Sequence, residues 1–320
     1  MELIRSTSDT RVESVPSELS RRNCGIIHSQ HEGSCYRWGA SGVLGRAVYK
    51  AFQAETGFKV KGIAHTRPSG EIEAVDLCDE GAATILIQSF KPDWVIHCAA
   101  ERRPDVAAKD PQAARTLNAE VPRTLARLSA SENQSFALVY ISTDYVFDGT
   151  SAPYGVDAKP NPLNFYGETK LAGENAVLDN TYLEKPGQRV VLRVPVLYGP
   201  APKNSDSAIN VLVDIVNDQS GKKYTMDHYA TRYPTNVVDI AEFLVRLTRL
   251  NKSLPPILHY SGTEPYTKYE VMDPLLRYYN VLISAVDLSC PGEDLKRVTR
   301  THPARRGSST SLSSGLEAKE

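Results

Sequence analysis

Two side chains in the 320-residue sequence have the spacing of a general acid–base pair. Tyr166 and Lys170 are four residues apart, so in a helix both side chains lie on one face. A phenol has a pKa of roughly 10, and an ammonium one turn away favours the phenolate, so the pair could transfer a proton at neutral pH. Thr143, upstream of the pair, could hydrogen-bond a substrate carbonyl beside the phenol. Tyr–Lys pairs are also common on helix surfaces, and the rest of the sequence decides between these interpretations.

The segments that must position these residues alternate between two kinds. Apolar, β-branched stretches predict buried strands at 58–64, 71–77, 93–99, 137–143 and 189–198. Between them the sequence predicts helices at 80–90, 111–131 and 166–178. This alternation predicts an α/β fold, a Rossmann-type doubly wound parallel sheet. Shorter elements follow residue 200: helices at 207–217, 237–250 and 267–279, the last interrupted at Pro274, and a strand at 257–261.

These elements predict four regions. Residues 1–33 are polar and are expected to be disordered or irregular, and residues 34–200 to form the large doubly wound domain. Residues 201–289, with parts of the first domain, are expected to form a smaller C-terminal substrate lobe over the strand ends. Residues 290–320 contain little that is apolar and predict a disordered tail.

A glycine-rich motif precedes the predicted helix that begins near Arg46. Glycines at this spacing allow the backbone to approach a pyrophosphate, and the helix N-terminus stabilises its charge. The motif should follow a buried strand, but residues 34–38 contain Arg37, and the apolar pair Ile26–Ile27 lies too far upstream. We therefore expect a first strand of only about three residues there, beside the strands that begin near 58 and 93. The motif assigns cofactor contacts to Gly39, Ser41, Gly42, Val43, Leu44 and Gly45.

The end of the second strand predicts the choice of cofactor. It carries Arg67 and no carboxylate, which favours the 2′-phosphate of NADP over NAD, although Arg67 could instead be a solvated loop residue. Asp76 would lie by the adenine or begin a helix. NADP is thus the expected cofactor and NAD the alternative. The remaining cofactor contacts are assigned to Leu77, Cys98, Ala99, Ala100 and Asn118, in addition to Tyr166 and Lys170.

Three arginines are candidates for binding a substrate or a partner. Arg102 and Arg103 follow the predicted strand at 93–99, at the edge where ligands bind in such a sheet. Their guanidinium groups could meet an anionic substrate or the carboxylates of a partner protein. They could equally belong to a solvated loop held by Arg–Asp pairs. Arg232 is grouped with them as a third candidate.

Composition excludes several classes of partner. The net charge of −1 argues against nucleic acid or an anionic membrane surface as the main partner. No apolar run approaches the roughly 20 residues that span a bilayer, and the acidic N-terminal residues argue against targeting peptides. Five cysteines without a CxxC spacing indicate reduced thiols in a cytoplasmic protein, with neither disulfides nor a metal site.

Several motifs together resemble a known family. They are HCAA (97–100), STDYVFDG (142–149), YGETK (166–170), LRVPVLYGP (192–200) and RYPTNVVDIA (232–241). They resemble the extended short-chain dehydrogenase/reductases, and among them the dTDP-4-dehydrorhamnose reductase (RmlD-like) branch. The string HCAAERRPDV (97–106) is similar to the regulatory β subunits of methionine adenosyltransferase, a non-catalytic group within that branch. The sequence departs from the family at its first strand and after about residue 290.

The resemblance implies roles for individual residues. The active-site hydroxyl falls on Thr143, the acid–base phenol on Tyr166, and Lys170 would also bind the nicotinamide ribose. It implies an NADP-binding regulatory subunit in S-adenosylmethionine biosynthesis, with the methionine adenosyltransferase catalytic subunit as partner. The alternative is an active NADPH-dependent reductase of a 4-keto nucleotide sugar, because the same three residues serve both. A third possibility, a remnant that binds no cofactor, follows if the first strand is lost.

Overall fold

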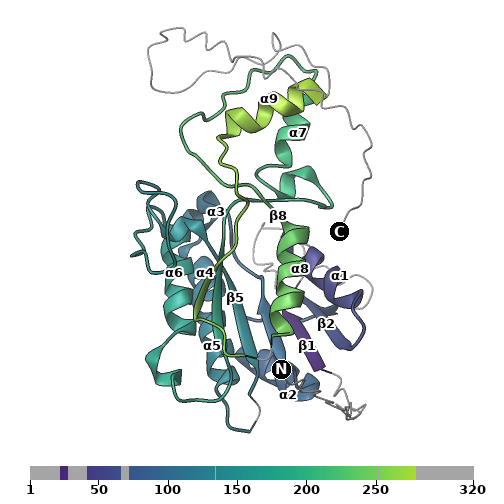
Figure 1. The fold of residues 1–320 in the computed structure, drawn as a ribbon, viewed down its shortest axis with the longest axis vertical. Coiled ribbons are helices and arrows are strands. Elements are labelled where there is room, and N and C mark those ends of the chain that lie inside the picture. The colour runs from purple at the N-terminus through teal and green to yellow at the C-terminus, as the bar shows by residue number, and fades with distance from the viewer. Residues whose placement is uncertain (1–21, 28–41, 66–71, 134, 251, 279–320) are drawn as a thin grey trace, which may run out of the picture.

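The computed structural model describes residues 22–27, 42–65, 72–133, 135–250 and 252–278 (Figure 1). Within these residues, seven parallel strands form one sheet in the order β3-β2-β1-β4-β5-β6-β9. The chain therefore starts in the middle of the sheet and moves outward first to one side and then to the other. This topology confirms the predicted doubly wound α/β fold. The strands are β1 (Arg22–Ile27), β2 (Phe58–Ala64), β3 (Glu73–Ala74), β4 (Trp94–His97), β5 (Ala137–Thr143), β6 (Arg189–Val194) and β9 (Ile257–His259).

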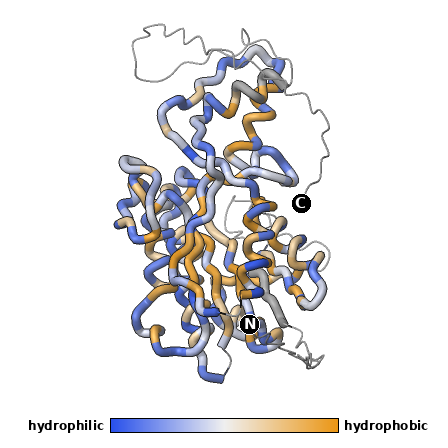
Figure 2. The backbone as a smooth tube through the Cα atoms, in the orientation of Figure 1, coloured by the Kyte–Doolittle hydropathy of each residue, from blue (hydrophilic) through white to orange (hydrophobic). Residues whose placement is uncertain are grey.

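Helices cover both faces of the sheet, and alternate strand residues point to each face. Ile96, Val139 and Leu192 pack against α1 (Val43–Gln53) and α8 (Val237–Thr248). Val95 and Leu138 face α2 (Glu80–Phe90) and α5 (Val121–Ser129). The central strands β4 and β5 are accordingly mostly apolar (Figure 2). The other helical segments are α3 (Pro104–Lys109), α4 (Pro111–Arg115), η1 (Thr116–Glu120), η2 (Asp144–Val146), α6 (Phe165–Val177), η3 (Asn180–Tyr182), η4 (Asn204–Asp206), α7 (Val211–Val216) and α9 (Lys268–Tyr278).

The first strand lies where the sequence analysis did not place it. Strand β1 is Arg22–Ile27, six residues long, and it pairs with β2 on one side and β4 on the other. The expected stub at 34–38 was wrong in position, because the central place in the sheet is already filled; residues 34–38 lie outside the described residues. Only Cys24–Ile27 is flanked on both sides, and this part contains no charged residue. The prediction that residues 1–33 are irregular is therefore wrong for residues 22–27. The possibility of a remnant that binds no cofactor rested on a lost first strand, and that strand is present.

Several predicted elements are shorter or divided. The strand expected at 71–77 is reduced to β3, and the helix expected at 111–131 is divided into α4, the π-helical turn η1, and α5. The strand expected at 189–198 ends at Val194, and residues 197–198 form β7 (Leu197–Tyr198) in a separate two-stranded sheet with β8 (Thr235–Asn236). Helix α9 continues through position 274 instead of breaking there, and α3 was not predicted.

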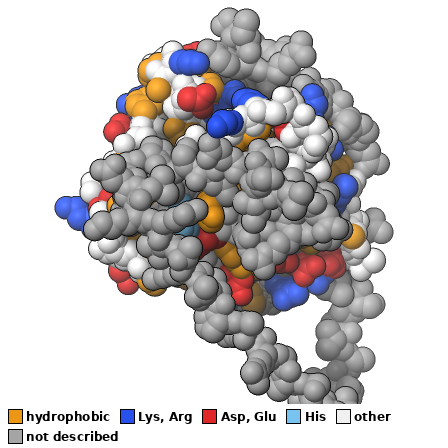
Figure 3. All heavy atoms as spheres, turned by 90° about the horizontal axis from the view of Figure 1, so that it is seen from above, with side chains coloured by type: hydrophobic (Ala, Val, Ile, Leu, Met, Phe, Trp, Pro, Cys, Tyr) orange, Lys and Arg blue, Asp and Glu red, His pale blue; other side chains and the backbone are white. Residues whose placement is uncertain are grey.

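The lobe above the sheet is built from two separate parts of the chain (Figure 1). Helices α7 and α9 pack together around a small core of Leu212, Val216, Met226 and Met272. Between them the chain returns to the main body, where α8 packs on α1 and β9 adds the last strand to the sheet. Seen from above, the described surface carries basic and acidic side chains together (Figure 3), in keeping with a net charge near zero.

Helix α6 approaches the sheet closely at Gly173. A Cβ at this position would meet the backbone oxygen of Asn118 and the hydroxyl of Tyr140, and would lie 2.8 Å from Tyr140 Cζ. Tyr140 is fully buried and donates a hydrogen bond of 2.9 Å to the same backbone oxygen. The absence of a side chain at Gly173 is therefore a packing requirement, and it fixes how near Tyr166 and Lys170 lie to the strand ends.

We predict that Gly173→Ala lowers the free energy of unfolding by about 1–3 kcal/mol, because overpacking forces backbone and side chains apart. Chemical denaturation of the two proteins measures this difference. Gly155→Ala is the matched control, since a Cβ there has no neighbour within 4 Å. Equal stability of the Gly173→Ala variant and the wild-type protein would contradict the close approach.

Candidate functional site

A cavity of about 230 Å³ lies at the carboxyl ends of the strands, where the sequence predicted ligand binding. It receives residues from the start of α1, the loop after β4, the end of β5, and α6. The structure thus brings together four segments that are far apart in the sequence. Predicted site residues that line it are Gly42, Val43, Leu44, Gly45, Cys98, Ala99, Ala100, Arg102, Thr143, Tyr166 and Lys170.

The start of α1 fits the phosphate groups of a dinucleotide. Gly42 is its N-cap residue, no side chain caps the helix by a hydrogen bond, and its first turn contains no acidic residue. Helix N-terminal N–H groups lack intrahelical partners and attract anions. Because Gly42, Val43 and Leu44 line the cavity, these donors lie at the place where a pyrophosphate would bind.

The ammonium of Lys170 contacts the backbone of β5 and the ring of Tyr140. Its ammonium donates a 2.8 Å hydrogen bond to the backbone oxygen of Ile141 and lies 3.9 Å from the centre of the Tyr140 ring. The side chain is buried, with 1% of its surface exposed. Burial lowers the pKa of Lys170 to about 7, and the nearby Glu174 carboxylate opposes this shift.

Tyr166 does not have the lowered pKa that its spacing from Lys170 suggested. Burial raises the pKa of its phenol, and the hydrogen bond with Thr143 opposes this only in part. The predicted phenolate is therefore wrong for this structure, because the cost of burying a negative charge outweighs the favourable interactions nearby. Tyr166 is present as a neutral phenol that can donate a proton.

Thr143 stands at the end of β5, as predicted. Its hydroxyl accepts a 3.2 Å hydrogen bond from the Tyr145 N–H and donates one of 3.2 Å to Asp144. It therefore caps η2 and faces the cavity at the same time. Thr143 and Tyr166 thus line the same cavity.

The three candidate arginines occupy different places. Arg102 lines the cavity, and burial lowers its pKa while Asp206 on the lobe side opposes the shift. Arg232 lies beside the cavity, 3.8 Å from Asp144 and with its guanidinium 4.9 Å from the centre of the Tyr145 ring. Arg103 is the N-cap residue of α3 and is not among the residues that line the cavity.

Three other residues predicted to bind the cofactor make contacts within the fold instead. Asp76 accepts a 2.9 Å hydrogen bond from the Cys78 N–H, while Asp79 is the N-cap residue of α2. Leu77 is buried in the core. Asn118 is buried and bonds the Glu101 backbone and the Thr169 hydroxyl. None of Asp76, Leu77 and Asn118 lines the cavity. Gly39, Ser41 and Arg67 lie outside the described residues.

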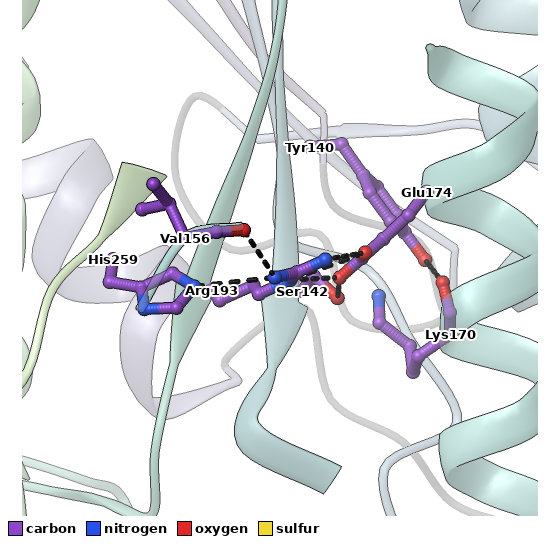
Figure 4. A network of polar contacts seen from close by, with 7 residues as sticks. All are labelled: Tyr140, Ser142, Val156, Lys170, Glu174, Arg193 and His259. Carbon is purple, nitrogen blue, oxygen red and sulfur yellow. Dashed lines mark hydrogen bonds and ion pairs between the residues drawn. The ribbon is translucent and has the colours of Figure 1, made fainter. Parts of the chain in front are cut away.

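Sequence reasoning missed a charged network directly behind the site (Figure 4). Glu174 and Arg193 form a buried ion pair of 2.7 Å, with 3% and 4% of their side chains exposed. Ser142 donates a 2.5 Å hydrogen bond to the same carboxylate. The available signal was the spacing, since Glu174 follows Lys170 by four residues on one helix face. Asp206, Ser207 and Ala208 of the lobe also line the cavity and were missed.

The described residues contain a second cavity, but no metal cluster and no helix suited to span a membrane. A larger hollow of about 650 Å³ between α1 and α8 contains none of the predicted catalytic residues. Within the described ranges, no three His, Cys, Asp or Glu side chains gather as a metal site would need. In the same ranges we find no helix with the length and apolar character of a membrane span.

Comparison with known proteins adds to this geometry. The family model described as RmlD substrate binding domain matches residues 35–313. Over 246 residues the chain is 45% identical to the methionine adenosyltransferase 2 subunit beta of Xenopus laevis, covering 76% of this chain and 71% of that protein. It is 32% identical to the dTDP-4-keto-6-deoxy-D-glucose reductase of Streptomyces niveus, covering 73% and 76%. The solved dTDP-4-dehydrorhamnose reductase of Bacillus anthracis, in complex with NADP, is similar with a TM-score of 0.63 and 25% identity, covering 80% and 81%.

The burial of Lys170 predicts a dependence of stability on pH. The unfolded chain keeps the ordinary pKa of 10.5, whereas the folded protein has a value of about 7, so between them the unfolded chain binds more protons. The free energy of unfolding therefore rises with pH in this window. Relative to Lys170→Met, the wild-type protein should gain up to about 1.4 kcal/mol for each pH unit crossed.

Denaturation at pH 7, 8 and 9 measures this difference between the two proteins. Lys252→Met, at an exposed position, is the control for the loss of a lysine charge. If the difference stays constant across this range, Lys170 titrates at its ordinary pKa and is not buried as described.

Proposed function

The chain belongs to the RmlD substrate binding domain family, within the extended short-chain dehydrogenase/reductases, and from this membership we propose that it is an NADP-binding regulatory subunit of methionine adenosyltransferase. The observation that carries the proposal is the 45% identity to the beta subunit from Xenopus laevis. Its partner would be a methionine adenosyltransferase catalytic subunit, and its process S-adenosylmethionine biosynthesis. The free thiols of Cys78 and Cys98 support a reducing compartment, and we place the protein in the cytoplasm.

NADP binding has independent support in the site. The uncapped N-terminus of α1 offers N–H groups to the pyrophosphate, and small residues at Cys98–Ala100 leave room for a flat ring system beside β4. Lys170 opens onto the same cavity and can donate to ribose hydroxyl groups. The Bacillus anthracis relative was solved with NADP, whereas other neighbours of this fold hold NAD. When bound, the nicotinamide would supply or accept hydride.

A second candidate function is reduction of a 4-keto nucleotide sugar. It is favoured by one observation, that Thr143, Tyr166 and Lys170 line a single cavity. The regulatory function is favoured by the higher identity to a methionine adenosyltransferase subunit, 45% against 32% to the reductase. The arrangement of Thr143, Tyr166 and Lys170 is compatible with either function.

Affinity capture tests the partner. The immobilised chain should retain a purified methionine adenosyltransferase catalytic subunit, whereas a dTDP-4-dehydrorhamnose reductase of the same fold, used as the matched bait, should not. Incubation with NADPH and a 4-keto-6-deoxy nucleotide sugar tests the alternative, with loss of NADPH absorbance as the readout. Failure of capture together with steady NADPH consumption would replace the regulatory function by the reductase function.

The preference for NADP over NAD depends on Arg67 in this proposal. If its guanidinium meets the 2′-phosphate, those hydrogen bonds contribute on the order of 1.5–3 kcal/mol. Arg67→Ala should then weaken NADP binding roughly ten- to hundredfold and leave NAD binding nearly unchanged, as measured by calorimetric titration. Equal losses for both cofactors would show that Arg67 contributes to folding and not to phosphate recognition.

A further inference from the structure

The buried network behind the cavity has a defined centre, the carboxylate of Glu174 (Figure 4). Arg193 on β6 donates to it from Nε, at 3.0 and 3.2 Å, and from Nη2 at 2.7 Å. Ser142 on β5 adds its hydroxyl. The remaining guanidinium nitrogen of Arg193 contacts the Val156 backbone oxygen at 3.4 Å and the His259 ring at 3.3 Å. The carboxylate is therefore fixed from two strands and cannot rotate freely.

Lys170 is anchored to the same piece of backbone. Its ammonium bonds the oxygen of Ile141, and the next residue, Ser142, bonds Glu174. Glu174 itself follows Lys170 by one turn of α6. The cation of the site and the buried anion behind it are thus held at fixed positions relative to one strand end.

We propose that Glu174 is a positioning residue of this site, whose fixed carboxylate favours the ammonium form of Lys170 and thereby the hydrogen bonds that Lys170 can donate to the ribose hydroxyl groups of a bound dinucleotide. A buried lysine without a nearby anion loses its proton. An amine is a weaker donor than an ammonium, since hydrogen bonds from charged donors are roughly twice as strong as neutral ones. Glu174 thereby acts on the ligand through Lys170, without touching the ligand.

The other groups that face Lys170 cannot supply this negative charge. Burial raises the pKa of the Cys98 thiol, after β4, to about 12, and raises that of the Tyr140 phenol on β5. Burial also keeps the Tyr166 phenol neutral. His259 is on the far side of Arg193, and burial together with that guanidinium lowers its pKa, which favours the uncharged imidazole. Glu174 is the group whose charge raises the pKa of Lys170 most.

The first test measures Lys170 directly in the cofactor-free protein. Side-chain NMR of lysine-labelled protein, with the signal assigned by its loss in Lys170→Met, gives the protonation of Lys170 against pH. Glu174→Gln should lower its midpoint by at least about one pH unit. Glu168→Gln, an exposed glutamate on the same helix, is the charge control, and Ser142→Ala removes a hydrogen bond but leaves both charges; neither should move the midpoint by as much.

Glu174→Gln leaves Arg193 buried without its anion and could prevent folding. The double variant Glu174→Gln/Arg193→Met removes both charges, and a neutral replacement of a buried ion pair is often tolerated. The Lys170 midpoint should fall in this variant too, because the attraction that raises it comes from Glu174.

The second test uses NADP, and this arm rests on the proposed function. The affinity for NADP should fall about tenfold in Glu174→Gln at pH 8, and the difference from the wild-type protein should shrink as the pH falls toward the lowered midpoint of the variant, where Lys170 gains its proton in both. Calorimetric titration from pH 5.5 to 8.5 gives this profile. If NADP binds to none of the proteins, the proposed function fails, while the NMR measurement still decides the role of Glu174.

Two outcomes would overturn the inference. An unchanged Lys170 midpoint in Glu174→Gln and in the double variant would show that Glu174 does not set the charge. A uniform loss of NADP affinity at every pH would show that the ion pair only supports the fold of this region.

Discussion

A parallel sheet that is covered on both faces leaves only its edges open to ligands, and this constraint governs the site. Helices α1 and α8 cover one face and α2 and α5 the other, so that strands β4, β5 and β6 carry buried apolar residues on both sides. The carboxyl ends of all strands then lie at one edge. Residues separated by more than a hundred positions, such as Gly42 and Lys170, meet there because they follow different strands of the same sheet.

Charge at that edge is possible only because it is neutralised within the protein. Burying an isolated ion costs several kcal/mol, so each buried charge near the cavity has a charged or hydrogen-bonding partner. Glu174 has Arg193, and Lys170 has the backbone oxygen of Ile141. The edge can therefore present a cation toward a ligand without losing the apolar core below it.

Patterns of apolar residues were enough to predict the frame of the fold. Strands β2 and β5 and helix α2 have the expected bounds, because apolar residues that alternate with lysines in β2, a continuous apolar run in β5 and a clear N-cap in α2 specify them locally. Strand β1 was missed because it begins with polar residues, and its central place depends on pairing with two strands much later in the chain. No pattern in the sequence around β1 indicates its pairing with β2 and β4.

The site could be predicted in outline but not in its electrostatics. The spacing of Tyr166 and Lys170 placed both in one cavity, yet the direction of the Tyr166 pKa shift depends on how deeply the fold buries the phenol. The partners of Glu174 come from β5 and β6, so their arrangement follows from strand order and not from sequence spacing. Similarly, Asp206 reaches the cavity only because the lobe lies over the sheet edge.

The return of the chain to the sheet after the first part of the lobe has a consequence for biosynthesis. During translation, the face that carries α1 remains uncovered until α8 has left the ribosome, and the outer edge of β6 remains unpaired until β9 follows. The apolar residues of that face are exposed for most of the synthesis of the chain, although domains tend to fold as they emerge. The sheet of the nascent chain is thus complete only when about residue 259 has been released.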